Sequence, residues 1–65
     1  MVTKEMIREK IAELDKSVEI LKKRLHETVD EAAREAVIEE MYVLMARTNR
    51  YLRAIGADEK EMYDL

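Results

Sequence analysis

Hydrophobic residues in the first half of the chain recur at alternating spacings of four and three residues. This heptad spacing places them along one face of an α-helix and is typical of a helix packed lengthwise against another helix. The seam consists of Ile7, Ile11, Leu14, Val18, Leu21 and Leu25. Thr3 stands where an N-cap would begin the helix, and basic side chains crowd its end, where they suit the helix dipole. The pattern predicts a helix over about residues 3–26.

The second half carries a wider hydrophobic stripe, with about three apolar positions in each heptad. The stripe consists of Val37, Ile38, Met41, Leu44, Met45, Tyr51, Leu52 and Ile55. A stripe this broad must contact more than one neighbouring helix. Gly56 follows it directly, where helices commonly end in the left-handed conformation that glycine tolerates. The pattern predicts a second helix over about residues 30–55.

Two polar residues interrupt the stripe of the second helix. We expect the hydroxyl of Thr48 to donate to the carbonyl oxygen of Leu44, one turn earlier, which satisfies the hydroxyl within the helix. We expect Arg34, near the beginning of the helix, to extend its guanidinium into water. We assign a binding or catalytic role to neither residue.

The hydrophobic seams of the two halves are out of phase by two residues. Continuing the first seam beyond Leu25 leads to polar or small positions, whereas the second helix uses Val37 and Met41. The segment from Thr28 to Glu31 is typical of a capping box, and Asp30 is an alternative N-cap. One long unbroken helix is the other interpretation, because no strong helix breaker separates the halves. The phase shift favours a tight turn at residues 27–30 and an antiparallel helical hairpin.

These elements predict an all-α domain over residues 1–56, followed by an acidic tail at residues 57–65 that we expect to be frayed. The chain has no proline, no cysteine and one glycine, which argues against sheet-rich and disulfide-bonded folds. A single hairpin cannot cover the broad stripe of its second helix. We therefore expect two hairpins to form a homodimer that closes a four-helix bundle.

The net charge and the residue types present disfavour several classes of function. Twelve Lys and Arg against fifteen Asp and Glu give a net charge of −3, which disfavours binding of nucleic acid by the whole surface. The only histidine, His26, lies beside lysines, and no Glu-x-x-His pair or glycine-rich phosphate loop occurs. We expect no enzyme, metal or cofactor. No apolar run approaches ~20 residues and no signal peptide is evident, so we expect a cytoplasmic protein without membrane contact.

Two groups of residues on the second helix are candidates for binding a partner. The first lies on its outward side and consists of Tyr42, Val43 and Ala46. The second consists of Asn49 with three arginines at every third position, Arg47, Arg50 and Arg53. The arginines either offset the helix dipole and pair with Glu5 and Glu9 of the first helix, or form a cationic strip for RNA, DNA or an acidic protein. The first hypothesis is an adaptor or regulatory protein-interaction module; the alternative is a nucleic-acid-binding regulator that also uses basic residues 22–24.

The layout of two equal amphipathic helices, closed by Ile55-Gly56 and an acidic tail, resembles the Rop-type plasmid RNA-organising proteins. It is also similar to small dimeric hairpin proteins proposed as adaptors in archaeal spindle-shaped viruses. Both resemblances cover the whole chain and imply an antiparallel dimeric bundle. In the Rop type, RNA is met by paired first helices that bear basic and polar residues and an aromatic. The first helix of this chain has no aromatic residue and departs from that pattern.

Overall fold

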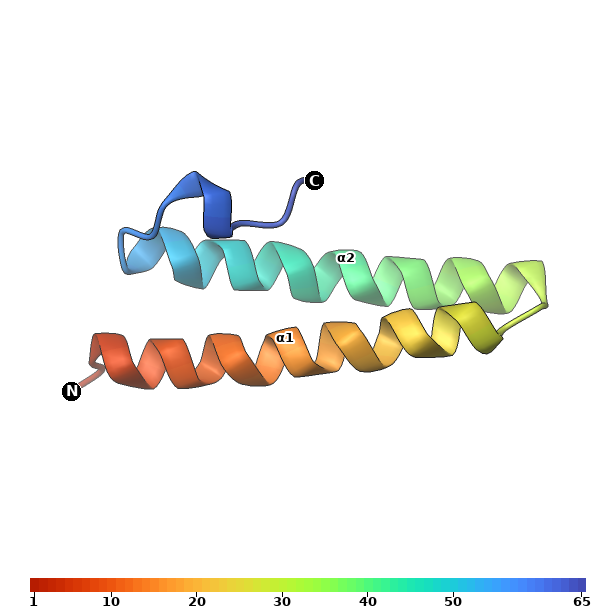
Figure 1. The fold of residues 1–65 in the computed structure, drawn as a ribbon, viewed down its shortest axis with the longest axis horizontal. Coiled ribbons are helices and arrows are strands. Elements are labelled where there is room, and N and C mark those ends of the chain that lie inside the picture. Colours follow the sequence, from red (N-terminus) through yellow and green to blue (C-terminus); the bar gives the residue numbers. More distant parts are fainter.

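The computed structural model describes all 65 residues and contains helices but no strand. Helix α1 spans Lys4–Glu27, helix α2 spans Glu31–Ala54, and a single 3-10 turn, η1, spans Glu59–Glu61. The two long helices run antiparallel along each other in a rod of 43 × 19 × 16 Å (Figure 1). The prediction of an all-α helical hairpin is confirmed, and the alternative of one unbroken helix is wrong.

Local capping explains where α1 begins and ends. The hydroxyl oxygen of Thr3 accepts a hydrogen bond from the backbone N–H of Met6 at 3.2 Å, as expected for an N-cap. At the other end, the N–H of Thr28 bonds the carbonyl of Leu25, and the Thr28 hydroxyl donates to the carbonyl of Arg24 at 2.6 Å. Thr28 therefore closes α1, and the capping box that we expected to begin α2 there is wrong.

The turn occupies residues 28–30, and Asp30 is the N-cap of α2. Its carboxylate accepts a hydrogen bond from the backbone N–H of Ala33 at 3.0 Å. Thr28 and Asp30 both have extended backbone, which lets the chain reverse within three residues. Asp30, the alternative N-cap, is therefore the residue that begins α2, because the hydroxyl of Thr28 bonds the last turn of α1.

Arg34 ties the beginning of α2 to the end of α1. Its Nη1 donates to the carbonyl oxygens of Leu25 at 2.7 Å and Thr28 at 2.9 Å, and these bonds are partly buried. The expectation that Arg34 extends into water is therefore wrong. The last carbonyls of a helix lack intrahelical donors and carry partial negative charge, so a cation from the neighbouring helix binds there favourably.

Replacing Arg34 with Ala should lower the free energy of unfolding by about 1.5–3 kcal/mol, because two charge-assisted hydrogen bonds are lost. Chemical denaturation followed by circular dichroism measures this change. Arg50→Ala is the matched control: its side chain is exposed on the same helix and makes no hydrogen bond or salt bridge. An equal loss in both variants would show that the bonds of Arg34 contribute nothing specific.

The core lies between the helices in two clusters. One contains Val18, Leu21, Val37 and Met41, and the other contains Ile11, Leu52 and Ile55. Leu14 is also buried, while five residues of the expected seam are only half-buried: Ile7, Leu25, Leu44, Met45 and Tyr51. Thr48 is 1% exposed and its hydroxyl donates to the carbonyl of Leu44 at 2.8 Å, as expected. Ile38 departs from the expected seam because 36% of its surface remains exposed.

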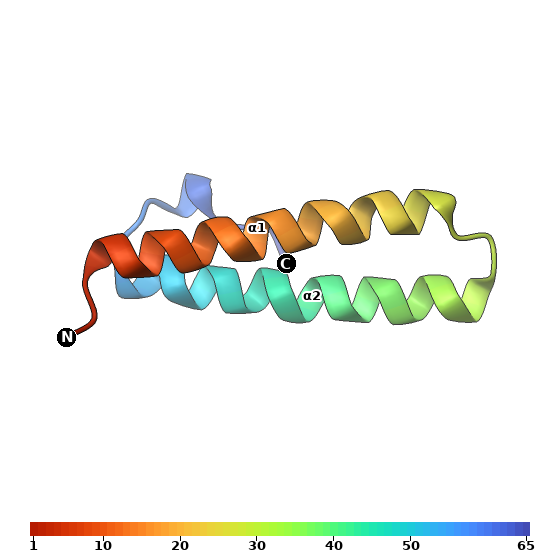
Figure 2. The ribbon, with the colours of Figure 1, turned by 90° about the horizontal axis from the view of Figure 1, so that it is seen from below.

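Gly56 ends the second helix and redirects the chain. Its φ of 71° is the left-handed conformation expected at this position, and the N–H of Ala57 bonds back to the carbonyl of Leu52 at 3.0 Å. Residues 57–65, hereafter the strap, then fold back along the hairpin through η1 (Figure 1 and Figure 2). The expectation of a frayed tail is wrong. Neither α1 nor α2 combines the length and apolarity that crossing a membrane requires.

Candidate interaction surface

A buried asparagine holds the strap to α2. The side-chain amide of Asn49 donates to the carbonyl oxygen of Tyr63 at 2.9 Å, and its oxygen accepts from the N–H of Tyr63 at 2.8 Å. This pair of bonds satisfies both main-chain groups of Tyr63 as a neighbouring strand would. Asn49 is only 4% exposed, so its expected place on the partner surface is wrong.

The side chain of Tyr63 also reaches across to α1. Its hydroxyl donates to a carboxylate oxygen of Asp15 at 2.7 Å. Partial burial raises the pKa of Tyr63 to about 12, and the hydrogen bond to Asp15 and the negative charges of Asp15 and Glu19 act in the same direction. One strap residue is thereby bonded to both long helices.

The raised pKa of Tyr63 predicts that stability falls at high pH. The protonated phenol is favoured in the folded state, so its contribution is complete below the ordinary pKa of 10.0 and is lost as pH rises toward about 12. Wild type should therefore lose more stability over this range than Tyr63→Phe, which has no phenol to ionise. Denaturant titrations of both proteins across this range measure the difference. Parallel pH curves would show that neither burial nor the contact with Asp15 raises the pKa of Tyr63 in the folded state.

The underside of the strap is apolar. Tyr63 packs against the core cluster that contains Val18, and Met62 and Ala57 pack against the cluster that contains Ile11. An exposed salt bridge from Arg8 to Glu61 at 3.5 Å adds little, because solvent screens such pairs. The strap therefore covers the groove between the helices near their Gly56 end.

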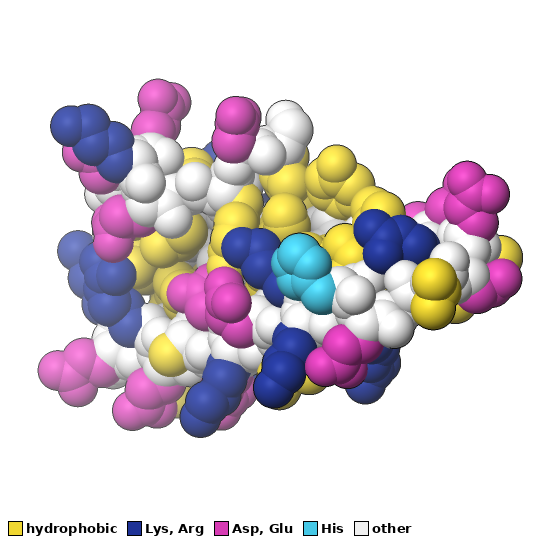
Figure 3. Space-filling model, turned by 45° about the vertical axis from the view of Figure 1, so that its right-hand side comes forward, with side chains coloured by type: hydrophobic (Ala, Val, Ile, Leu, Met, Phe, Trp, Pro, Cys, Tyr) yellow, Lys and Arg dark blue, Asp and Glu magenta, His cyan; other side chains and the backbone are white.

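The same groove stays open toward the turn. Five hydrophobic residues line this part, together with Asp64 of the strap: Leu25, Ile38, Met41, Tyr42 and Met45. They enclose a hollow of about 290 Å³, and hydrophobic side chains gather beside the strap on the face seen in Figure 3. Tyr42 is 54% exposed, and a half-exposed aromatic beside methionines is typical of surfaces that bind other proteins. The five hydrophobic residues are hereafter the open groove.

The other candidate residues of α2 lie outside this groove. Val43 is 57% exposed and Ala46 is also exposed. Arg47, Arg50 and Arg53 are exposed and take part in none of the salt bridges, which join Arg8–Glu61, Lys10–Glu13 and Lys22–Glu19. The expected pairing of these arginines with Glu5 and Glu9 is therefore wrong, and their charges remain available on the outer surface.

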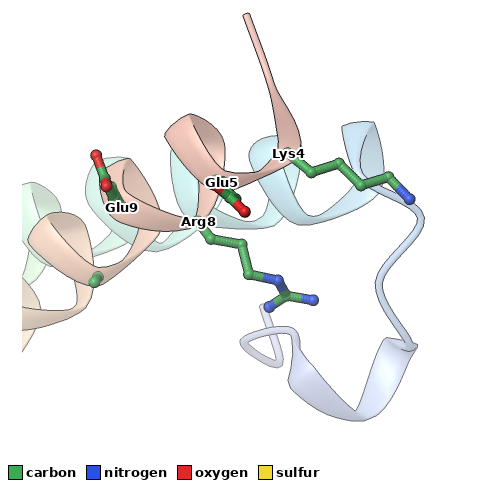
Figure 4. A pocket seen from close by; sticks show the side chains of 5 residues that line it. Lys4, Glu5, Arg8 and Glu9 are labelled. Carbon is green, nitrogen blue, oxygen red and sulfur yellow. The ribbon is translucent and has the colours of Figure 1, made fainter.

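A second hollow lies along the outer side of α1. It is lined by Lys4, Glu5, Arg8, Glu9 and Ala12. Figure 4 shows the side chain of Arg8 reaching toward the strap, whereas Glu9 points away from it. All five lining residues are exposed, and no group of three His, Asp or Glu side chains is close enough to hold a metal ion. This hollow is a gap between solvated charged side chains and has the character of ordinary surface.

The strap, and the interhelical groove that the strap divides, were not predicted from the sequence. Two signals were present: a single Asn within the arginine row of α2, and an aromatic followed by an acid near residue 63. Neither signal indicates that Asn49 and Tyr63 bond each other. Comparisons with family models, curated proteins and solved structures find no match for this chain. The function proposed below therefore rests on the open groove, the strap and the exposed residues of α2.

Proposed function

We propose that this protein is a small, non-catalytic interaction module that forms a homodimer through the open groove and acts as an adaptor. Two hairpins paired at this groove would make a four-helix arrangement. The observation that carries the proposal is the open groove itself, which leaves Ile38 and Tyr42 exposed beside the half-buried Leu25 and Met45. A second copy supplies the same apolar residues, so a two-fold pairing buries both sets at once.

The exposed area of the monomer supports a second copy as the occupant. The chain exposes 5299 Å² to solvent. A folded monomer of this mass is expected to expose roughly 4,300 Å² by the usual scaling of surface with mass. The excess of roughly 1,000 Å² is comparable with the ~800 Å² that each partner buries in a stable interface. Pairing with a second hairpin would bury an area comparable with that excess.

The adaptor role is supported by what the dimer would leave exposed. Val43 and Ala46 lie on α2 outside the open groove, and three unpaired arginines continue the same outer surface. Exposed apolar residues rimmed by arginine suit recognition of another protein. Dimerisation would then use the side of α2 that lines the open groove, and partner binding would use its outer side.

Sedimentation equilibrium at micromolar concentrations tests the homodimer. The expected result is a mass about twice the 7.7 kDa of the chain, with dissociation on dilution. A folded species of 7.7 kDa at every concentration would eliminate the homodimer. For the adaptor role, affinity capture from the native host should lose partners with Val43→Asp but keep them with Ile20→Asp, a comparable change on an exposed residue of α1. Identical partner lists from both variants would remove this surface from consideration.

A second candidate function is supported by the free charges of Arg47, Arg50 and Arg53. Cations that are not engaged in salt bridges can neutralise phosphates, and such binding weakens steeply as salt rises. Gel-shift titrations with structured RNA and with duplex DNA between ~50 and ~200 mM salt test it. No retention at the lowest salt concentration eliminates this candidate, and retention there that falls with salt favours it over a purely protein-binding role.

A further inference from the structure

The strap and the open groove occupy one continuous face of the hairpin. Tyr63 packs on the same core cluster as Leu25 and Met45, which line the open groove. Asp64, the next strap residue, forms part of the groove wall. The strap therefore borders the proposed interface for a second hairpin.

We propose that the strap competes with a second hairpin for this face, so that opening the strap strengthens self-association. The proposal rests on the homodimer proposed above and assigns its regulation. Strap opening would uncover Ile11, Leu52 and Ile55, against which Met62 and Ala57 now pack. These residues lie along the same interhelical groove, so their exposure would lengthen the apolar surface that a partner can bury.

The strap is held by few contacts, and it has a hinge. Its side-chain bonds to the hairpin are the two with Asn49, the one with Asp15 and the exposed contact with Arg8. The backbone at Gly56 adopts a conformation that glycine enters readily, so the chain can change direction there. A short segment fixed by a few hydrogen bonds and by the packing of three half-buried side chains, Ala57, Met62 and Tyr63, opens at lower free energy than the core of the hairpin.

The fraction of molecules with an open strap determines how strongly the hairpins self-associate. When the closed state dominates and both copies must open to pair over the full face, the apparent dimer Kd scales inversely with the square of the open fraction. Removing one hydrogen bond of ordinary net strength raises the open fraction roughly fivefold. Because both copies must open, the dimer Kd should fall by the square of this factor, roughly 25-fold, and by more when both bonds of Asn49 are removed.

The experiment compares full-length wild type with Tyr63→Phe and Asn49→Ala. In Tyr63→Phe, strap opening is read from the hydrogen exchange of the residue 63 N–H, which bonds Asn49 in the closed state; Asn49→Ala removes that acceptor and is therefore compared by its Kd alone. Self-association is read from the dimer Kd by sedimentation. Tyr51→Phe is the matched control, because Tyr51 is also half-buried against the core and its hydroxyl makes no hydrogen bond. Circular dichroism verifies that each variant keeps its helices.

The expected result is faster exchange at residue 63 and a roughly 25-fold lower Kd in Tyr63→Phe, with neither change in Tyr51→Phe. A Kd that stays constant or rises while exchange accelerates would overturn the competition and would place the closed strap within the dimer interface or away from it. A wild type that remains monomeric instead overturns the homodimer proposal on which this one rests. Tyr63→Phe retains the packing of the aromatic ring, so the test survives if Asn49→Ala fails to fold.

Discussion

Replacing Val18 with Asp should unfold the hairpin. Val18 is completely buried, at 0% exposure, within the larger core cluster, where hydrophobic side chains pack around it. The substitution removes apolar packing and places an unpaired carboxylate in the core, a change that costs on the order of 4 kcal/mol or more. A chain of 65 residues has a total stability of only roughly 3–10 kcal/mol. The helical signal in circular dichroism should be lost at room temperature.

Val43→Asp is the matched control for that experiment. It makes the same substitution on α2 at a residue that is 57% exposed and outside both core clusters. Surface changes of this kind usually alter stability by less than ~0.5 kcal/mol. If Val43→Asp unfolds the chain as readily as Val18→Asp does, then negative charge or helix propensity, and not burial, controls the stability of this hairpin.

The double variant Ile38→Glu/Met45→Glu should convert the proposed homodimer into a monomer. Both residues line the open groove, so a two-fold pairing would bring four new carboxylates together in an apolar interface. Burying or juxtaposing like charges costs several kcal/mol, which corresponds to a rise in dimer Kd of at least ~100-fold. Ile38 is exposed and Met45 is half-buried, so the hairpin itself should stay helical. Sedimentation equilibrium and circular dichroism measure the two properties.

The control repeats the same residue changes on α1, as Met6→Glu/Ile20→Glu. These side chains are 52% and 58% exposed and do not line the open groove. The control should remain dimeric with an unchanged Kd. Dissociation of the control together with persistence of the groove variant would place the interface on the outer side of α1 and contradict the proposed face.

Periodicity predicted the helices well because the relevant forces act within one or two turns. The seam from Ile7 to Leu25 and the stripe around Met41 gave helices whose ends differ by one residue from those of α1 and α2. Caps such as Thr3, and the stop at Gly56, act through backbone atoms nearby in sequence. The two-residue phase shift between the seams carried the topological information, since a single helix cannot direct both seams to one side.

The predictions for Thr28 and Arg34 were wrong because each side chain has two possible hydrogen-bond partners. Thr28 could cap either helix, and the choice depends on how the chain reverses, which leaves Asp30 to begin α2. Arg34 has water on one side and the end of α1 on the other, and its position becomes evident only when the helices are placed together. In both cases the partner is decided only when the hairpin forms and brings the end of α1 beside the beginning of α2.

The sequence by itself determined the two helices and their antiparallel pairing, because helix formation and capping depend on local spacing. Only the tertiary structure decided that Asn49 is buried, that Tyr63 bonds Asp15 across 48 positions of the chain, and that the strap divides the interhelical groove. These contacts carry no periodic signal, since each joins single residues whose proximity is created by the hairpin. The open part of the groove is therefore a property of the folded chain, set by how the strap packs across the hairpin.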